Sequence, residues 1–178
     1  ASLSCLDDTF ISVTIYEVGN TAAISGDAEL AKQLCVEANI NMQEPSVDCD
    51  LSQGVIVDSL LGTGFSGPLR GNFALAIEVI NSSFLPVLSI DVPSGLSSDT
   101  GAVEDIAVKA DLTVTFVGAK QGLFTGRGPA LCGEIIYDSL DIPESVLQKM
   151  SPSAELMDLS ELVEYIPELD ADVHKNQR

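Results

Sequence analysis

Two aspartates stand where chemistry is expected, each at the end of an apolar run and before a glycine-containing turn. Asp58 ends the run Gly-Val-Ile-Val-Asp, and Asp91 ends the run Pro-Val-Leu-Ser-Ile-Asp. Carboxylates at such positions can transfer protons or bind cations. The alternative is that each aspartate caps its own turn, a common role for this residue.

Ser94 lies in a turn whose shape is specified by its neighbours. Pro93 fixes its own φ and biases Val92 towards an extended conformation, while Gly95 permits positive φ. Oxygen ligands from Asp58, Ser94 and nearby carbonyls would suit a hard cation. We therefore treat Asp58 and Ser94 as candidate metal ligands.

A glycine-rich loop follows the first aspartate. It matches the pattern G-x-G-x-x-G after a predicted strand, and Asp91 follows 24 residues after Gly67, as in a dinucleotide-binding fingerprint. Pro68 and Gly71 delay the next helix, yet the loop amides can still form an anion-binding nest. A plain tight turn is the alternative. The candidate ligand-binding residues are Gly62, Thr63, Gly64, Phe65, Ser66, Gly67 and Pro68.

Three of the eight basic residues, Arg70, Lys120 and Arg127, fall shortly after predicted strand ends. In so acidic a chain this placement suggests charge matching to an anionic ligand. Each base has the alternative of being a solvated surface residue, which is weakest for Lys120 in its glycine-flanked turn. Lys120 and Asp91 are the candidate catalytic residues.

These residues must be positioned by the elements around them. Residues 72–81 have a helical apolar pattern between the two runs, which predicts a βαβ unit with both aspartates at the carboxyl edge of a parallel sheet. We expect the two turns to line one pocket. Further strands are predicted at 10–18, 112–117 and 133–137, a helix at 27–38, and a loop at 39–53. The predicted fold is α/β, a Rossmann-like doubly wound and mainly parallel sheet with helices on both faces, in three layers.

Composition limits the partners. The chain has 178 residues and a formal net charge of -19, which opposes binding to nucleic acid or anionic membranes. No apolar run is long enough for a membrane span, and the N-terminus lacks a signal-peptide pattern, so the chain is expected to be soluble and cytoplasmic, or organellar in a eukaryote. Four scattered cysteines and one histidine disfavour a zinc site or disulfide framework.

Four motifs occur in an order that resembles the NAD(P)HX epimerases, the YjeF N-terminal domain family. They are Val-Asp-Ser-Leu-Leu-Gly-Thr-Gly, Ser-Ile-Asp-Val-Pro-Ser-Gly-Leu, Ala-Asp-Leu-Thr-Val-Thr-Phe and Lys-Gln-Gly-Leu-Phe-Thr-Gly. The resemblance runs from about Ile11 to Ile142. It implies an isomerase that interconverts the C6 epimers of hydrated NADH and NADPH, with one potassium ion per subunit. By this resemblance Asp58 and Ser94 bind potassium, residues 62–68 bind the dinucleotide, and Asp91 contacts the hydrated nicotinamide.

The resemblance also implies a domain organisation. Residues 1–145 form the epimerase domain, which we expect to be N-terminally incomplete because the family's Asn-Asn-Gly-Gly-Asp loop has no counterpart. Residues 146–178 form an acidic linker or tail, with a short helix at 159–165. The segment Asp172-Val173-His174-Lys175 resembles the start of a dehydratase domain, so a fused or separate dehydratase is an expected partner, and homo-oligomerisation stays open.

Two other functions are compatible with this sequence. A non-catalytic nucleotide-binding or protein-interaction module could use the same fold. An NAD-dependent dehydrogenase is the weaker alternative, since it would need a proton donor near the hydride site, and the chain has neither a Tyr-x-x-x-Lys motif nor a histidine outside the tail.

Overall fold

The computed structural model describes residues 12–20, 24–46, 49 and 51–157. The chain divides into two compact units, Ala1–Asp141 and Ile142–Arg178. The candidate residues at 58 to 120 all belong to the first unit.

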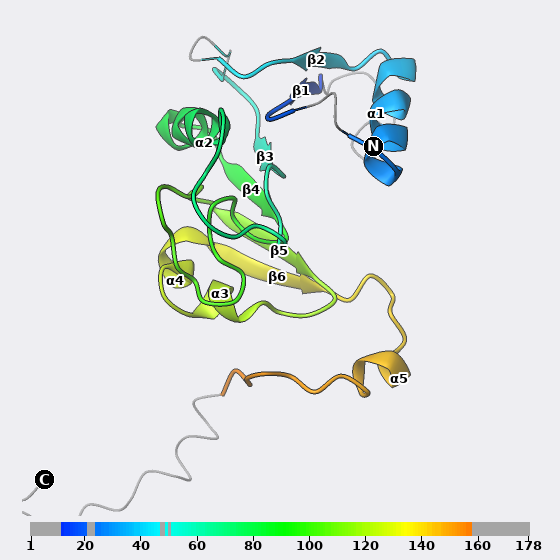
Figure 1. Cartoon of the computed structure of the whole chain (residues 1–178), viewed down its shortest axis with the longest axis vertical. Helices are drawn as coiled ribbons and strands as arrows, with labels where there is room; N and C mark the ends of the chain where they lie inside the picture. Colours follow the sequence, from blue (N-terminus) through cyan, green and yellow to red (C-terminus); the bar gives the residue numbers. More distant parts are fainter. Residues whose placement is uncertain (1–11, 21–23, 47–48, 50, 158–178) are drawn as a thin grey trace, which may run out of the picture. The chain divides into compact units, whose positions relative to one another are not determined.

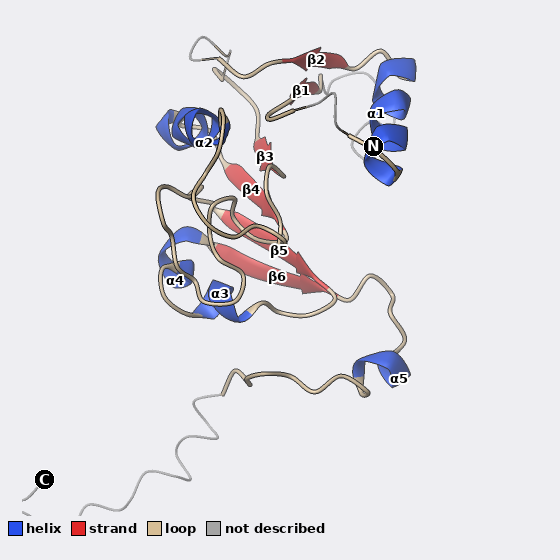
Figure 2. Cartoon of the chain, viewed as in Figure 1, coloured by secondary structure: helices blue, strands red, loops and turns tan. Residues whose placement is uncertain are grey.

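The first unit contains a four-stranded parallel sheet in the order β3-β4-β5-β6 (Figures 1 and 2). The strands are β3 (Ile56–Asp58), β4 (Val87–Ile90), β5 (Leu112–Phe116) and β6 (Glu134–Asp138). All four were predicted from their apolar, β-branched runs. Because the strands are parallel and follow each other in sequence order, the segments after them emerge at one edge of the sheet.

The connections between these strands differ in length and content. Helix α2 (Phe73–Ser82) joins β3 to β4, as predicted. The connection from β4 to β5 contains no helix among the described residues. Two single-turn helices, α3 (Gln121–Phe124) and α4 (Gly128–Leu131), lie between β5 and β6. They were not predicted, because four residues are too few to give a helical apolar period.

A second, two-stranded parallel sheet precedes the larger one in the chain. It pairs β1 (Thr14–Tyr16) with β2 (Asn41–Gln43), and α1 (Asp27–Glu37) connects them. Helix α1 was predicted, and β1 lies inside the predicted strand, of which residues 10 and 11 are outside the described part. The prediction of a loop throughout 39–53 was wrong at β2, since this three-residue strand is mostly polar and gives no strand signal.

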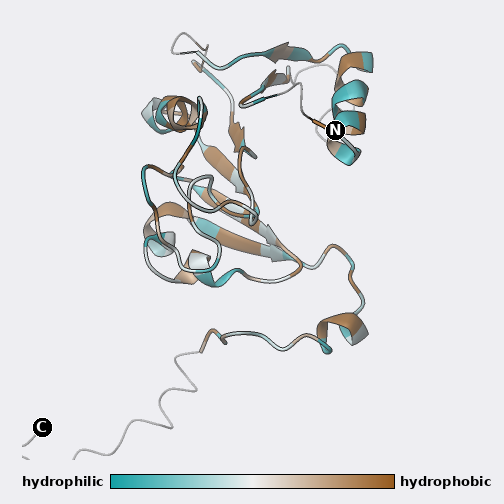
Figure 3. Ribbon diagram, viewed as in Figure 1, coloured by the Kyte–Doolittle hydropathy of each residue, from teal (hydrophilic) through white to brown (hydrophobic). Residues whose placement is uncertain are grey.

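The larger sheet is stabilised by two apolar clusters. In one, Ile77 of α2 is fully buried with Val87 of β4 and with Val108 and Ala110 of the loop before β5. The other joins the loop after β4 to the α3 and α4 region, and its buried members are Val92, Leu96, Ala107, Leu123, Leu131 and Cys132. Figure 3 shows hydrophobic residues on the strands of this sheet and on α2, and a mixture of hydrophobic and hydrophilic residues along α1. The α/β parallel architecture is therefore confirmed.

The second unit contributes one short helix, α5 (Glu144–Leu147), followed by residues without regular structure up to 157. The helix predicted at 159–165 lies outside the described residues. Within the described ranges, no helix has the length and apolar character to cross a membrane. Among the described residues, Cys35, Cys49 and Cys132 form no disulfide.

Candidate functional site

Asp91 lies at the carboxyl end of β4 in an unusual backbone conformation. Its φ is 72°, and the N–H of Val92 donates to the carbonyl of Ile90 at 2.9 Å. This is a three-residue γ-turn with positive φ at its centre, a rare and strained geometry for a residue other than glycine. Strain of this kind clusters at functional sites, where the surrounding structure maintains it. The turn places the Asp91 carboxylate beyond the end of the strand.

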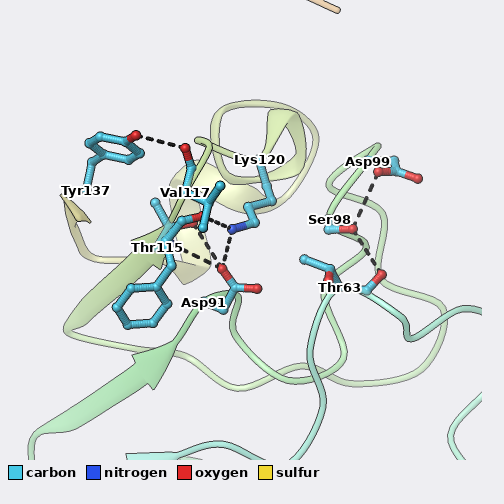
Figure 4. Close-up of polar contacts among 9 residues, drawn as sticks. Thr63, Asp91, Ser98, Asp99, Thr115, Val117, Lys120 and Tyr137 are labelled. Atoms are coloured by element: carbon cyan, nitrogen blue, oxygen red, sulfur yellow. Dashed lines mark hydrogen bonds and ion pairs between the residues drawn. The ribbon is translucent and has the colours of Figure 1, made fainter. Parts of the chain in front are cut away.

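The Asp91 carboxylate is bound on one side only. Its Oδ1 accepts hydrogen bonds from the Lys120 ammonium, and at 3.4 Å from both Thr115 Oγ1 and the Phe116 N–H (Figure 4). Among the described residues, nothing donates to Oδ2, which Figure 4 draws pointing away from these contacts. The side chains of Lys120 and Asp91 are 18% and 23% exposed. One carboxylate oxygen is thus free to meet a ligand beside an ammonium group.

Lys120 reaches Asp91 because the segment after β5 is closely docked. Its Nζ also donates to the carbonyl of Phe116 at 2.7 Å, so two acceptors fix the ammonium. The following helix α3 lies against the loop after β4, where the Gly122 N–H donates to the Ser98 carbonyl at 2.6 Å. A Cβ at Gly122 would lie 2.0 Å from the Ser97 carbonyl oxygen, so only glycine allows this approach. The sequence prediction named both residues of the pair but not their contact.

Asp58 lies deeper than Asp91. The register pairs Asp58 with Ser89, two residues before Asp91, and Asp58 is 1% exposed. Its Oδ2 accepts from Ser89 Oγ at 2.8 Å and from the Ser94 N–H at 2.9 Å, and its Oδ1 accepts from Ser94 Oγ at 2.6 Å and from the Leu60 N–H at 3.3 Å. The structure therefore brings Asp58 and Ser94 together, as predicted, and shows no hydrogen bond or ion pair between them and the pair of Asp91 and Lys120.

The oxygen atoms around Asp58 are of the kind that binds a hard cation. No basic side chain forms an ion pair with this buried carboxylate in the described part of the chain, and buried charges are normally paired or bound to a metal. The Ser94 hydroxyl lies 2.6 Å from Asp58 Oδ1 and 3.4 Å from the Leu61 carbonyl oxygen. Because its single proton can be given to either acceptor, turning it towards Leu61 would leave Oδ1 with one donor, the Leu60 N–H at 3.3 Å. No cluster of three or more His, Cys, Asp or Glu is found in the described ranges, so the candidate ligands are oxygens of these three residues.

The glycine loop is open to ligand on its main-chain side. Within it, the Phe65 N–H donates to the Gly62 carbonyl at 3.0 Å. The N–H groups of its other non-proline residues make no hydrogen bond to the described part of the chain, and these residues are Gly62, Thr63, Gly64, Ser66 and Gly67. A Cβ added at Gly62 or Gly64 would meet nothing within 4 Å. Five free amides and open space suit an anion-binding nest.

The glycine loop and the loop that begins at Gly95 line one pocket, but neither Asp58 nor Asp91 is among its lining residues. Residues 65–67 and Leu69 form one wall, and residues of the loop between Gly95 and Ile106 form the other, around a volume of about 140 Å³. Glu104 and Asp105 contribute carboxylates to this lining, and no base does. Its charge therefore suits a neutral, hydrogen-bonding part of a ligand better than a phosphate. Arg70 and Arg127 are exposed and form no ion pair among the described residues.

Several polar residues of this site were missed from the sequence. Ser89 and Thr115 are fully buried and hydrogen-bond to Asp58 and Asp91 respectively. Polar residues alternating with apolar ones inside a predicted strand were the available signal. Tyr137 of β6, whose hydroxyl donates to the Val117 carbonyl at 2.8 Å, gave no signal that distinguishes it from a surface tyrosine.

Comparison of the sequence with known proteins identifies a family. The family model described as "YjeF-related protein N-terminus" matches residues 3–122. The "Bifunctional NAD(P)H-hydrate repair enzyme Nnr" of Coxiella burnetii is 38% identical over 166 residues, which are 93% of this chain and 34% of that protein. The "NAD(P)H-hydrate epimerase" of Limosilactobacillus fermentum is 40% identical over 127 residues, 70% of this chain and 59% of that protein.

A crystal structure of the yeast protein ynu0 matches with a TM-score of 0.49 and 20% identity, covering 64% of this chain and 49% of that one. The chain spans about a third of the length of the bifunctional relatives from Coxiella burnetii and Vibrio cholerae, at 34% of each.

Proposed function

The chain belongs to the YjeF-related protein N-terminus family, and we propose that it is an isomerase that interconverts the C6 epimers of hydrated NADH and NADPH. The relatives that carry the names of NAD(P)H-hydrate epimerase and repair enzyme support this activity. The observation in the chain that carries it is the Asp91 carboxylate, held by Lys120 through one oxygen and free at the other. A site of this kind can move a proton at one defined position.

The reaction needs only a proton to be given and returned. In the hydrated cofactor the C6 hydroxyl lies next to the ring nitrogen, so the carbon loses its configuration if the hydroxyl leaves or the ring opens. If the hydroxyl leaves, a proton from the pair of Lys120 and Asp91 reaches it, the C6–O bond breaks and water departs. Water then adds to the opposite face of C6 and returns the proton to the pair. No atoms or electrons are gained or lost overall.

Binding of the dinucleotide is assigned to residues 62–68. The five free amides of this loop support phosphate binding, and the adjoining pocket with its two carboxylates suits a neutral sugar or amide group. Asp91 would then contact the hydrated nicotinamide. In this arrangement the loop binds and orients the ligand, while the pair of Asp91 and Lys120 transfers the proton.

A potassium ion, one per subunit, completes the proposal. Asp58 and Ser94 would hold it together with the Leu61 carbonyl, since these oxygens are buried together and lack a basic partner in the described part. The ion would supply positive charge to a strongly acidic chain that binds an anionic ligand. We also propose a cytoplasmic or organellar location and a dehydratase, fused or separate, as the enzyme that uses the product, because relatives are named bifunctional and the chain covers a third of their length.

The test starts from a purified single epimer of hydrated NADH. Its conversion to the other epimer is followed by chromatography with and without the protein, in potassium and in a bulky organic cation. Acceleration above the spontaneous rate supports the proposal. Binding of the dinucleotide without acceleration would identify a binding module instead, and transfer of hydride to or from the nicotinamide would identify a dehydrogenase.

A further inference from the structure

A second strained turn lies directly next to the candidate catalytic pair. After β5, Val117 has a φ of 66°, and the Gly118 N–H donates to the Phe116 carbonyl at 2.7 Å. This is again a γ-turn with positive φ at its centre, like the turn of Asp91 on the neighbouring strand. A β-branched residue is an outlier in this region, because its side chain crowds the backbone. The turn persists only if other contacts hold it.

Strand β6 supplies those contacts. The Val117 N–H donates to the Asp138 carbonyl at 2.9 Å. The Val117 carbonyl accepts from the Tyr137 hydroxyl at 2.8 Å, as Figure 4 shows. The first bond continues the strand ladder and needs no particular side chain. The second depends on the tyrosine hydroxyl. Tyr137 pairs with Thr115 across the sheet, and Thr115 itself donates to Asp91.

The turn determines where the lysine ammonium is held. The Phe116 carbonyl that closes the turn also accepts from Lys120 Nζ at 2.7 Å, and the same Nζ contacts Asp91. A shift of Val117 would therefore move the carbonyl that orients Lys120. The contacts form one continuous series from the Tyr137 hydroxyl through the turn to the Asp91 carboxylate.

We propose that Tyr137 is a positioning residue. Its hydroxyl stabilises the Val117 turn and so keeps the Lys120 ammonium in contact with the Asp91 carboxylate. The inference rests on the proposed function for its catalytic consequence, but not for the contact itself. Tyr137 is 49% exposed, so its ring is not a core element whose loss would open a cavity. Removing only the hydroxyl should loosen the turn and leave the fold intact.

The experiment compares Tyr137→Phe with Tyr16→Phe, a matched loss of a hydroxyl in a strand of the other sheet. Hydrogen exchange at the Gly118 amide reports the turn, and the ¹³Cε resonance of Lys120 reports the ammonium position. In Tyr137→Phe we expect Gly118 to exchange about three- to tenfold faster, as for loss of one hydrogen bond, with the amides of β5 unchanged. We also expect the Lys120 resonance to shift. The kcat of epimerisation should fall about three- to tenfold, and KM should stay within about twofold of the wild-type value, because the lysine acts on proton transfer rather than on binding.

The possible results separate this inference from the proposed function. Local changes at Gly118 and Lys120 with a lower kcat support the positioning role. Unchanged exchange and an unchanged Lys120 resonance overturn it, as does a normal kcat in an enzyme whose wild type is active. If the wild type does not epimerise, the proposed function fails. The two spectroscopic readouts then decide alone whether Tyr137 positions Lys120.

Discussion

The variant Gly64→Val tests the glycine loop with little disturbance of the fold. A Cβ at Gly64 meets no atom within 4 Å, and the φ of this glycine is not in the positive region, so the loop as it stands has room for the Cβ of valine. We expect the free energy of unfolding to change by less than about 1 kcal/mol, with loss of unfolded-state entropy offsetting any local strain. The side chain would, however, fill the space that a phosphate needs to reach the free amides.

The expected loss of affinity follows from those amides. Each hydrogen bond to a charged acceptor contributes about 1.5 to 3 kcal/mol, so losing one should weaken binding about 10- to 150-fold. Calorimetric titration with hydrated NADH measures this, and urea unfolding of the same sample measures stability. The contrasting variant is Gly122→Ala, whose Cβ would lie 2.0 Å from the Ser97 oxygen and should destabilise the domain by about 1 to 3 kcal/mol. Normal affinity in a folded Gly64→Val would refute the role of the loop.

Three further predictions follow from the buried groups. Asp58→Asn should remove any dependence of dinucleotide affinity on potassium, measured by titration in potassium and in a bulky organic cation, and a retained dependence would place the ion elsewhere. The same variant should lower the free energy of unfolding by about 2 to 4 kcal/mol. An amide nitrogen in place of Oδ2 cannot accept the hydrogen bonds that Ser89 Oγ and the Ser94 N–H donate to that oxygen. Burial raises the pKa of the Cys132 thiol to about 11 from 9.0, which favours the neutral thiol in the folded state. Stability should therefore fall by about 2 to 3 kcal/mol as pH rises from 9 to 11, and Cys132→Ala should remove this part of the urea-unfolding pH profile.

Sequence patterns predicted those elements that bury a whole apolar face. The run at 87–90 and the helix at 73–82 are apolar enough that only a buried strand and an amphipathic helix explain them. Strand β2 was missed because its pairing with β1, rather than its own residues, creates it. Helices α3 and α4 were missed because each is a single turn whose position depends on close backbone approach at a glycine. Gly122 approaches Ser97 and Ser98, which are distant in the sequence, and Gly128 approaches Gly122 and Leu123.

The candidate site was predictable in its residue types and less so in its contacts. Strand ends marked Asp58 and Asp91, and the position of Ser94 in a Pro-Ser-Gly turn marked it as well. The depth of Asp58 depends on the register between β3 and β4, which residue types alone do not give. The contact of Lys120 with Asp91 depends on two γ-turns with positive φ at non-glycine residues. Local propensity disfavours both turns, so tertiary contacts must impose them.

The most direct measurement of the central claim is the rate of epimerisation by Asp91→Asn. The amide keeps the shape of the side chain and can still accept from Lys120, so the account predicts that affinity for hydrated NADH stays within a few-fold of wild type. Loss of proton transfer should slow interconversion, followed by chromatography from a single epimer, by about 10² to 10⁴. A normal rate would contradict the account, and equal losses of affinity and rate would restrict Asp91 to positioning the ligand.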